Sequence, residues 1–293
     1  MRDRFCSVHS LEHSTKPGMR SMALTRLWDG IENTVRDRLW LFSHEERCQN
    51  EGWGFEADSR MTPTEACAYM NVPNTMLARY NGRPAMPFDR HLIAMRPLRR
   101  VAWSLTGMGG RTSDDEREHV LDCLRRFPNI SGVLLDDFFE NTDEDGRHAT
   151  LSIRQLQEIR DQLELPDRHA DIYSVIYSHQ LDLPVQEHVE MCDVVTFWTW
   201  KARDLDGLEE NFEKFATLTK NVRRAVGLYM YDFGGKKLLP LDLMRMQAEL
   251  ALKWLRDGRI EAIILHATPI CDLEFEAVEW SRRWVEEIGD EAL

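Results

Sequence analysis

Two adjacent carboxylates, Asp136 and Asp137, are the residues whose types and spacing most clearly suggest chemistry. They follow the apolar run 131–135, where an ionised group is costly to remove from water unless it is paired or used. Two acids held close together resist simultaneous ionisation, so one stays protonated while the other stays charged. The sequence therefore predicts a general acid beside an anion, a division of roles that suits cleavage of glycosidic bonds.

A different second carboxylate is needed if Asp137 caps or braces the following loop and only Asp136 faces the site. The second catalytic acid would then come from Asp232 or from Glu45, which follow other predicted strands. The separation of the carboxyl groups would decide the stereochemistry, with about 5 Å for a retaining mechanism and about 6.5 to 9.5 Å for an inverting one. The candidate catalytic residues are therefore Asp136, Asp137 and Asp232.

The elements that must position these acids form a repeating pattern. Short runs rich in β-branched and aromatic residues alternate with amphipathic segments, as in parallel sheets built from strand–helix units. The predicted strands are residues 38–44, 75–81, 100–105, 132–138, 171–177, 193–200, 225–232 and 261–266. Their number and spacing favour an α/β fold, a single (β/α)8 barrel over residues 38–293. An open doubly wound sheet often has a glycine-rich phosphate turn after its first strand, and the sequence has no such motif there.

Helices are predicted between these strands from apolar spacings of three and four residues. The predicted segments are 88–95, 152–163, 183–191, 208–222, 241–256 and 273–288. Two further helices have clear start signals, Thr62 followed by Pro63 and Ser113 followed by Glu116. Residues 1–37 are predicted to form an N-terminal extension, of which residues 22–36 look helical.

Polar and aromatic residues stand at the end of every predicted strand. In barrel enzymes the chemistry lies on the loops that follow the carboxyl ends of the strands, so these residues are expected to converge on one pocket. The two-residue period of a strand also places Trp198 with Trp200, and Tyr229 with Tyr231, on one face each. The predicted substrate-binding residues are His44, Glu45, Arg79, Asn81, Trp103, Tyr177, His179, Trp198, Trp200, Lys201, Tyr229, Tyr231 and His266. Aromatic faces beside hydrogen-bonding groups suit a carbohydrate.

An apolar strand that ends in Asp136-Asp137, with Tyr, Trp and Asp at later strand ends, resembles barrel glycoside hydrolases. The resemblance is strongest to the hexosaminidase families that place an Asp-Asp pair after strand four. It implies that Asp136 orients the acetamido group of the substrate, which acts as the internal nucleophile. It also implies that Asp137 is the general acid/base.

The composition narrows the range of partners. A net charge of −13 argues against nucleic acid or an anionic membrane surface, and a neutral or locally cationic small molecule fits better. The six cysteines are scattered without any CxxC motif, so neither a zinc site nor a disulfide framework is indicated, and no cofactor is expected. Without a signal-like or membrane-spanning run, a cytoplasmic protein is expected, and such barrels often form homodimers.

Two other functional classes remain open. A metal-dependent hydrolase or isomerase would use His44, Glu45, Asp136, Asp232 and His266, but the HxH and HExxH patterns are absent. A non-catalytic carbohydrate-binding barrel would keep the aromatic residues and lose the acids, whereas this chain has both.

Two loops have weaker interpretations. Residues 140–148 are predicted to be a solvated acidic loop that borders the site. Residues 233–237, which include two glycines, form either a flexible turn or an anion site made of backbone amides.

Overall fold

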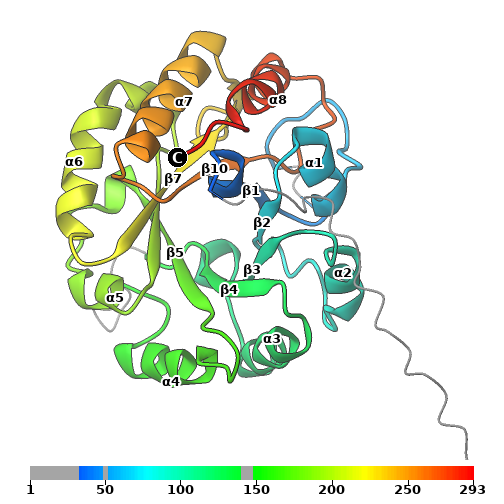
Figure 1. Cartoon of the computed structure of the whole chain (residues 1–293), viewed down its shortest axis with the longest axis vertical. Helices are drawn as coiled ribbons and strands as arrows, with labels where there is room; N and C mark the ends of the chain where they lie inside the picture. The colour runs from blue at the N-terminus through cyan, green and yellow to red at the C-terminus, as the bar shows by residue number, and fades with distance from the viewer. Residues whose placement is uncertain (1–32, 49–51, 140–147) are drawn as a thin grey trace, which may run out of the picture.

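The computed structural model, which describes residues 33–48, 52–139 and 148–293, has a closed barrel of parallel strands at its centre (Figure 1). The barrel strands are β1 (Leu39–Ser43), β2 (Asn74–Leu77), β3 (Arg100–Thr106), β4 (Ile130–Leu135), β5 (Asp171–Tyr177), β6 (Val194–Trp198), β7 (Arg223–Tyr229) and β10 (Ala262–His266). The last strand, β10, pairs with β1 and closes the ring. The predicted (β/α)8 barrel is therefore confirmed.

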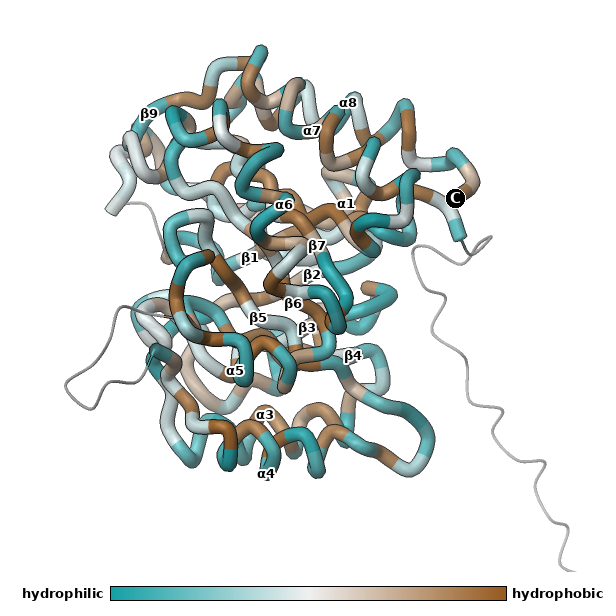
Figure 2. The backbone as a smooth tube through the Cα atoms, turned by 90° about the vertical axis from the view of Figure 1, so that its left-hand side faces the viewer, coloured by the Kyte–Doolittle hydropathy of each residue, from teal (hydrophilic) through white to brown (hydrophobic). Residues whose placement is uncertain are grey.

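Helices surround the barrel on its outside (Figure 1). They are α1 (Pro63–Met70), α2 (Asp89–Ala94), α3 (Asp114–Arg126), α4 (Ile153–Leu163), α5 (Gln186–Glu190), α6 (Leu208–Leu218), α7 (Leu241–Arg256) and α8 (Glu276–Ile288). Thr62 and Ser113 cap α1 and α3 by accepting the backbone N–H of Glu65 and Glu116, as their sequence signals predict. Figure 2 shows hydrophobic and hydrophilic residues alternating along α7 and α8, as expected of helices with one buried face.

The inside of the barrel is filled with large side chains. Every residue of β1, β6 and β10 is buried, as parallel strands covered on both faces require. Phe42 and Trp198 pack with their ring centroids 5.2 Å apart. Trp198 lies directly over Gly227 of β7, where an added Cβ would come within 2.1 Å of the indole ring. Gly227 therefore makes room for Trp198 in this layer of the barrel.

Several predicted strands end earlier in the structure, the runs 132–138 and 193–200 at Leu135 and Trp198, and at two others the chain pairs locally. The run 225–232 leaves the barrel after Tyr229, and β8 (Tyr231–Asp232) pairs antiparallel with β9 (Lys237–Leu238) in a separate hairpin. The run 75–81 ends as a strand at Leu77, because Tyr80 and Arg83 exchange two backbone hydrogen bonds of 3.0 Å in a tight turn. In both cases local pairing replaces pairing with the barrel.

The predicted helix over residues 22–36 falls mostly outside the described residues. Within them, Thr34 forms an antiparallel bridge with Ala292, and a short 3-10 helix spans Arg36–Arg38. Of the acidic loop 140–148, only His148 is described. In the part of the chain that the structure describes, no helix combines the length and apolarity needed to cross a membrane.

Candidate active site

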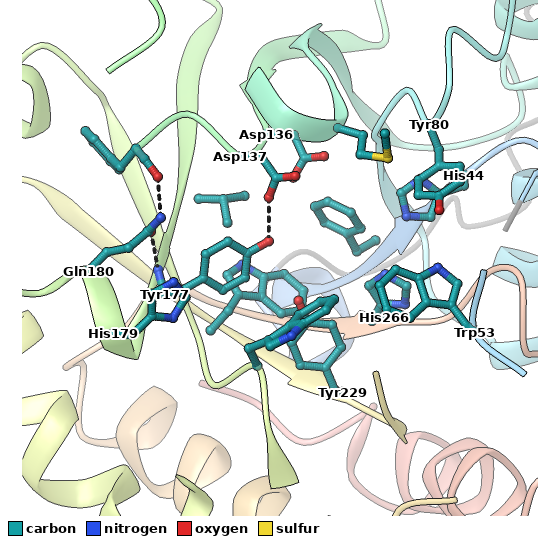
Figure 3. A pocket seen from close by; sticks show the side chains of 16 residues that line it. His44, Trp53, Tyr80, Asp136, Asp137, Tyr177, His179, Gln180, Tyr229 and His266 are labelled. Atoms are coloured by element: carbon teal, nitrogen blue, oxygen red, sulfur yellow. Dashed lines mark hydrogen bonds between the residues drawn. The ribbon is translucent and has the colours of Figure 1, made fainter. Parts of the chain in front are cut away.

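A cavity of about 500 Å³ opens at the carboxyl ends of the barrel strands; we call it the central cavity. It lies where residues at or just after the ends of β1, β4, β5, β6, β7 and β10 come together (Figure 3). Its lining includes the predicted site residues His44, Asp136, Asp137, Tyr177, His179, Trp198, Trp200, Tyr229 and His266. The cavity has the size and the mixed polar and aromatic walls of a small-molecule site.

The two carboxylates meet at the end of β4. Asp136 is 5% exposed, and the next residue, Asp137, has a positive φ of 45°. Adjacent side chains on a regular strand point to opposite faces, but the left-handed turn at Asp137 lets both acids line the central cavity (Figure 3). Asp137 Oδ1 accepts a 2.8 Å hydrogen bond from the Tyr177 hydroxyl, and Oδ2 accepts a 2.9 Å bond from the backbone N–H of Gly109.

The two acids have different electrostatic surroundings. Burial, and then the nearby charge of Asp137, raise the pKa of Asp136 well above its ordinary value. Asp137 instead accepts two hydrogen bonds, one from the Tyr177 hydroxyl and one from the Gly109 backbone N–H. The pair therefore consists of a buried acid that holds its proton more tightly than an ordinary aspartate beside a carboxylate fixed by two hydrogen bonds. Asp137 also fixes the loop before α3, so it both braces a loop and faces the cavity.

The β3–α3 loop reaches Asp137 because it contains two consecutive glycines. Gly109 and Gly110 each have a φ of 65°, a left-handed conformation that favours glycine. A Cβ added to Gly110 would lie 2.1 Å from Thr150 Oγ1 and 3.0 Å from the backbone oxygen of Asp137. A side chain at position 110 would therefore push apart the loop that holds the carboxylate.

Two buried histidines form another part of the lining. The ring nitrogen Nδ1 of His44 lies 2.9 Å from the carbonyl oxygen of Ala78 and donates to it, which leaves Nε2 as a hydrogen-bond acceptor. Burial lowers the pKa of His44 to about 4 and lowers that of His266 well below its ordinary value. Both imidazoles are therefore neutral near pH 7. Nδ1 of His266 is buried and has no hydrogen-bond partner among the described residues.

Aromatic rings form much of the wall. Trp200 contacts Tyr229 and Trp53 with centroid distances of 5.6 and 5.4 Å. Burial raises the pKa values of the Tyr177 and Tyr229 hydroxyls well above their ordinary range, so both stay protonated and can donate hydrogen bonds. No Lys or Arg is among the described residues that line the cavity.

Sequence reasoning missed several lining residues. They are Phe42, Trp53, Tyr80, Met108, Phe139, Val175 and Gln180. Tyr80 comes three residues after the end of β2 and Gln180 three residues after the end of β5, so the strand-end rule could have included both. Trp53 stands far into the loop after β1, and no local pattern in the sequence shows that this loop folds back over the barrel.

Other predicted site residues lie outside the central cavity. Asp232 Oδ1 accepts the backbone N–H groups of Gly235 and Ala202 at 2.8 and 3.2 Å, so this carboxylate braces the loops after β6 and β8. Glu45 forms an ion pair with Arg83 at 2.7 Å. Neither Asp232 nor Glu45 is placed to be a second acid beside Asp136.

The remaining predicted contacts have structural surroundings of their own. Arg79 donates to the carbonyl of Pro84 at 3.1 Å and pairs with Glu116, and Asn81 lies in the turn after β2. Trp103 packs against Phe88 at 5.0 Å. The Tyr231 hydroxyl donates to the backbone oxygen of Trp53 at 2.9 Å, and the Lys201 side chain lies against Gly234. None of these predicted residues lines the cavity.

The metal alternative is not supported by the arrangement of ligands. Among the described residues, three-residue groups with metal-ligand spacing are Asp89, His119 and Cys123, and separately His169, Asp171 and Asp193. Neither group contributes to the central cavity, and Glu45 and Asp232 lie outside it. The five residues that a metal centre would need are therefore not brought together.

The anion alternative at residues 233–237 meets a similar difficulty. Gly234 donates its backbone N–H to the Trp200 carbonyl at 3.3 Å, and Gly235 donates to Asp232. The glycine amides that would bind an anion are thus already used within the protein.

Comparison with known proteins supports the fold class. No family model matches the sequence, and no curated protein matches it significantly. The catalytic domain of a hyperthermophilic chitinase from Pyrococcus furiosus superposes with a TM-score of 0.57 at 10% identity, over 89% of this chain and 99% of that one. A putative alpha-L-fucosidase from Bacteroides thetaiotaomicron gives 0.53 at 10% identity, over 94% and 100% of the two chains.

Not every similar structure is a glycoside hydrolase. A putative 2-pyrone-4,6-dicarboxylic acid hydrolase from Pseudomonas putida gives a TM-score of 0.53 at 14% identity, over 88% of this chain and 92% of that one. The chain therefore resembles TIM-barrel glycoside hydrolases in fold, and at these identities the likeness concerns the fold alone.

Proposed function

We propose that this protein is a glycoside hydrolase that cleaves glycosides of a 2-acetamido sugar in the central cavity. The observation that supports the proposal is the state of the carboxylate pair. Asp136 is buried with a raised pKa, while Asp137 accepts hydrogen bonds from Tyr177 and Gly109 beside the same aromatic-walled space. A protonated acid next to an anion is the pair of groups that glycoside cleavage needs.

The surroundings favour participation of the substrate over an enzymic nucleophile. Mechanisms with two independent carboxylates need them on either side of the scissile bond. Here both acids of the cavity lining follow a single strand, and Asp232 and Glu45 lie elsewhere. A substrate acetamido group supplies the nucleophile that no other carboxylate among the described cavity residues provides: its oxygen attacks the anomeric carbon as the bond to the leaving oxygen breaks.

The burial of Asp136 and the two hydrogen bonds to Asp137 support roles that are the reverse of those implied by the sequence resemblance. Asp136 gives its proton to the leaving oxygen. Asp137, held by Tyr177 and Gly109, accepts the acetamido N–H and stabilises the positive charge that develops on that group. Water then opens the cyclic intermediate and returns a proton to Asp136.

Substrates with different leaving groups test these roles. Turnover of aryl 2-acetamido-glycosides would be measured for D136N, D137N and, as a matched buried control outside the cavity, D232N. Loss of a general acid lowers the rate of turnover about 10²- to 10⁴-fold when the leaving group is poor, such as a sugar. The rate falls much less with dinitrophenolate, which leaves without a proton. We therefore expect D136N to be slow with the sugar leaving group and much faster with dinitrophenolate, and D137N to be slow with both substrates.

Three results would contradict the proposal. Absence of turnover by the unmodified protein would favour the alternative of a non-catalytic carbohydrate-binding barrel. Full activity of D136N and D137N would place the chemistry elsewhere. Recovery by D137N in place of D136N would restore the roles implied by the resemblance.

A further inference from the structure

A second hollow of about 620 Å³ lies on the loops beside the central cavity; we call it the side groove. Its walls come from residues 54–57 after β1, from the β8–β9 hairpin and from residues 272–275 before α8. Phe55, Tyr231 and Phe275 form an aromatic cluster in it, with ring centroids 5.0 Å apart for Phe55 and Tyr231 and 5.6 Å apart for Tyr231 and Phe275. The roles described so far do not use this groove.

The side groove shares a wall with the central cavity. Trp53 lines the central cavity while Phe55, two residues further on, lines the side groove. Two residues of chain span at most about 7 Å, so the two sites lie on either side of a thin segment. The Tyr231 hydroxyl fixes this segment through the backbone oxygen of Trp53 at 2.9 Å. Phe233 contacts both Trp53 and Tyr231, at 5.4 and 5.2 Å, so ring contacts continue from one site to the other.

The polar groups of the side groove suit hydroxyl groups better than an ion. Lys236 and Lys237 share its lining with Glu56, Asp272 and Glu274, so both signs of charge are present. Asp272 Oδ2 accepts the backbone N–H of Arg60 at 2.7 Å. Its Oδ1 is buried and has no hydrogen-bond partner among the described residues, which leaves an acceptor for a ligand donor.

The rim of the side groove also exposes an apolar side chain. Leu238 of the β8–β9 hairpin is 60% exposed, so its apolar side chain is accessible to a ligand. Leucine and aromatic faces beside hydrogen-bonding groups match a sugar ring, which has apolar faces and polar edges.

We infer that the side groove binds a second sugar unit of the same glycan chain whose first unit occupies the central cavity. The inference rests on the proposed function and names its substrate class: an oligosaccharide that crosses the Trp53 segment. The continuity of the two sites selects this occupant over a separate ligand.

Binding to the full chain with D136N, which slows turnover of an oligosaccharide, tests the inference. N-acetylglucosamine and its β-1,4-linked tetrasaccharide would each be titrated by calorimetry. We expect the tetrasaccharide to bind at least about tenfold more tightly, equivalent to about 1.4 kcal/mol. Adding L238S or F55A should remove most of this gain without changing the affinity for the monosaccharide. I93S is the matched control, because Ile93 on α2 is 51% exposed and lies outside the side groove.

The outcomes separate the two proposals. Equal affinity for both sugars, or a tetrasaccharide affinity that L238S and F55A leave unchanged, overturns the side-groove inference alone. No binding of either sugar overturns the proposed function and the inference with it. L238S alters an exposed side chain, so its result stands even if F55A disturbs the aromatic cluster.

Discussion

Replacing Asp136 with asparagine should make the protein more stable near neutral pH while it slows turnover of substrates with a poor leaving group. Burial and the charge of Asp137 raise the pKa of Asp136 in the folded protein above the ordinary value of 3.8. Between that value and the raised pKa, the folded state keeps a proton that the unfolded chain releases. Stability therefore falls as the pH rises through this window, and above it the folded protein has the full cost of a buried charge.

The size of the effect follows from the linkage relation. Each unit by which the pKa is raised corresponds to about 1.4 kcal/mol lost at pH values above the window. For a chain of this length, 1 kcal/mol changes the melting temperature by roughly 2 to 4 °C. D136N removes the ionisable group and keeps the shape, so we expect its melting temperature to exceed that of the unmodified protein at pH 8.

Thermal unfolding of both proteins at several pH values from 4 to 8 would measure the difference. It should be small near pH 4 and grow as the pH rises. D232N provides a contrast, because Asp232 is buried but accepts two backbone N–H groups, and weakening these bonds should lower the melting temperature. A D136N difference that is constant with pH, or a D136N protein less stable at pH 8, would refute the assignment of a raised pKa.

Three further changes probe the surroundings of the pair. Y177F removes the hydrogen bond to Asp137 Oδ1 and should lower kcat about 10- to 100-fold with little change in melting temperature; an unchanged kcat would deny Tyr177 a positioning role. G110A should unfold at a clearly lower temperature than G109A, because only position 110 meets Thr150, and equal melting temperatures would contradict the packing of the loop. Burial lowers the pKa of His44 from 6.5 to about 4, so its contribution of about 3 kcal/mol is complete above pH 6.5 and is lost as the pH falls towards 4. H44Q should flatten this acid limb of the stability curve, and an unaltered limb would exclude His44 as its cause.

The fold was accessible from sequence because its signals are local and repeated. Each predicted strand overlaps an observed barrel strand, and Thr62 and Ser113 cap helices as their sequence patterns indicate. Asp136 and Asp137 were identified because a buried strand that ends in two acids is a local conflict between burial and charge.

The position of other site residues depended on non-local geometry. Alternation predicts Tyr231 on the same face as Tyr229, but the chain leaves the barrel at Met230, so Tyr231 and Asp232 are used in a hairpin. No pattern in residues 225–232 shows that break, because strand propensity continues through it. Trp53 was missed for a related reason: its place over the barrel depends on a hydrogen bond from Tyr231, far away in the chain.

The left-handed backbone of Asp137 limits which residues evolution can place there. With a φ of 45°, most side chains would strain the turn, whereas aspartate, asparagine and glycine tolerate this conformation. A lineage that abandoned the chemistry but kept the barrel would therefore be expected to show Asp-Asn or Asp-Gly at this place. In a related sequence, either pair at the end of this strand would indicate a barrel that binds carbohydrate without cleaving it.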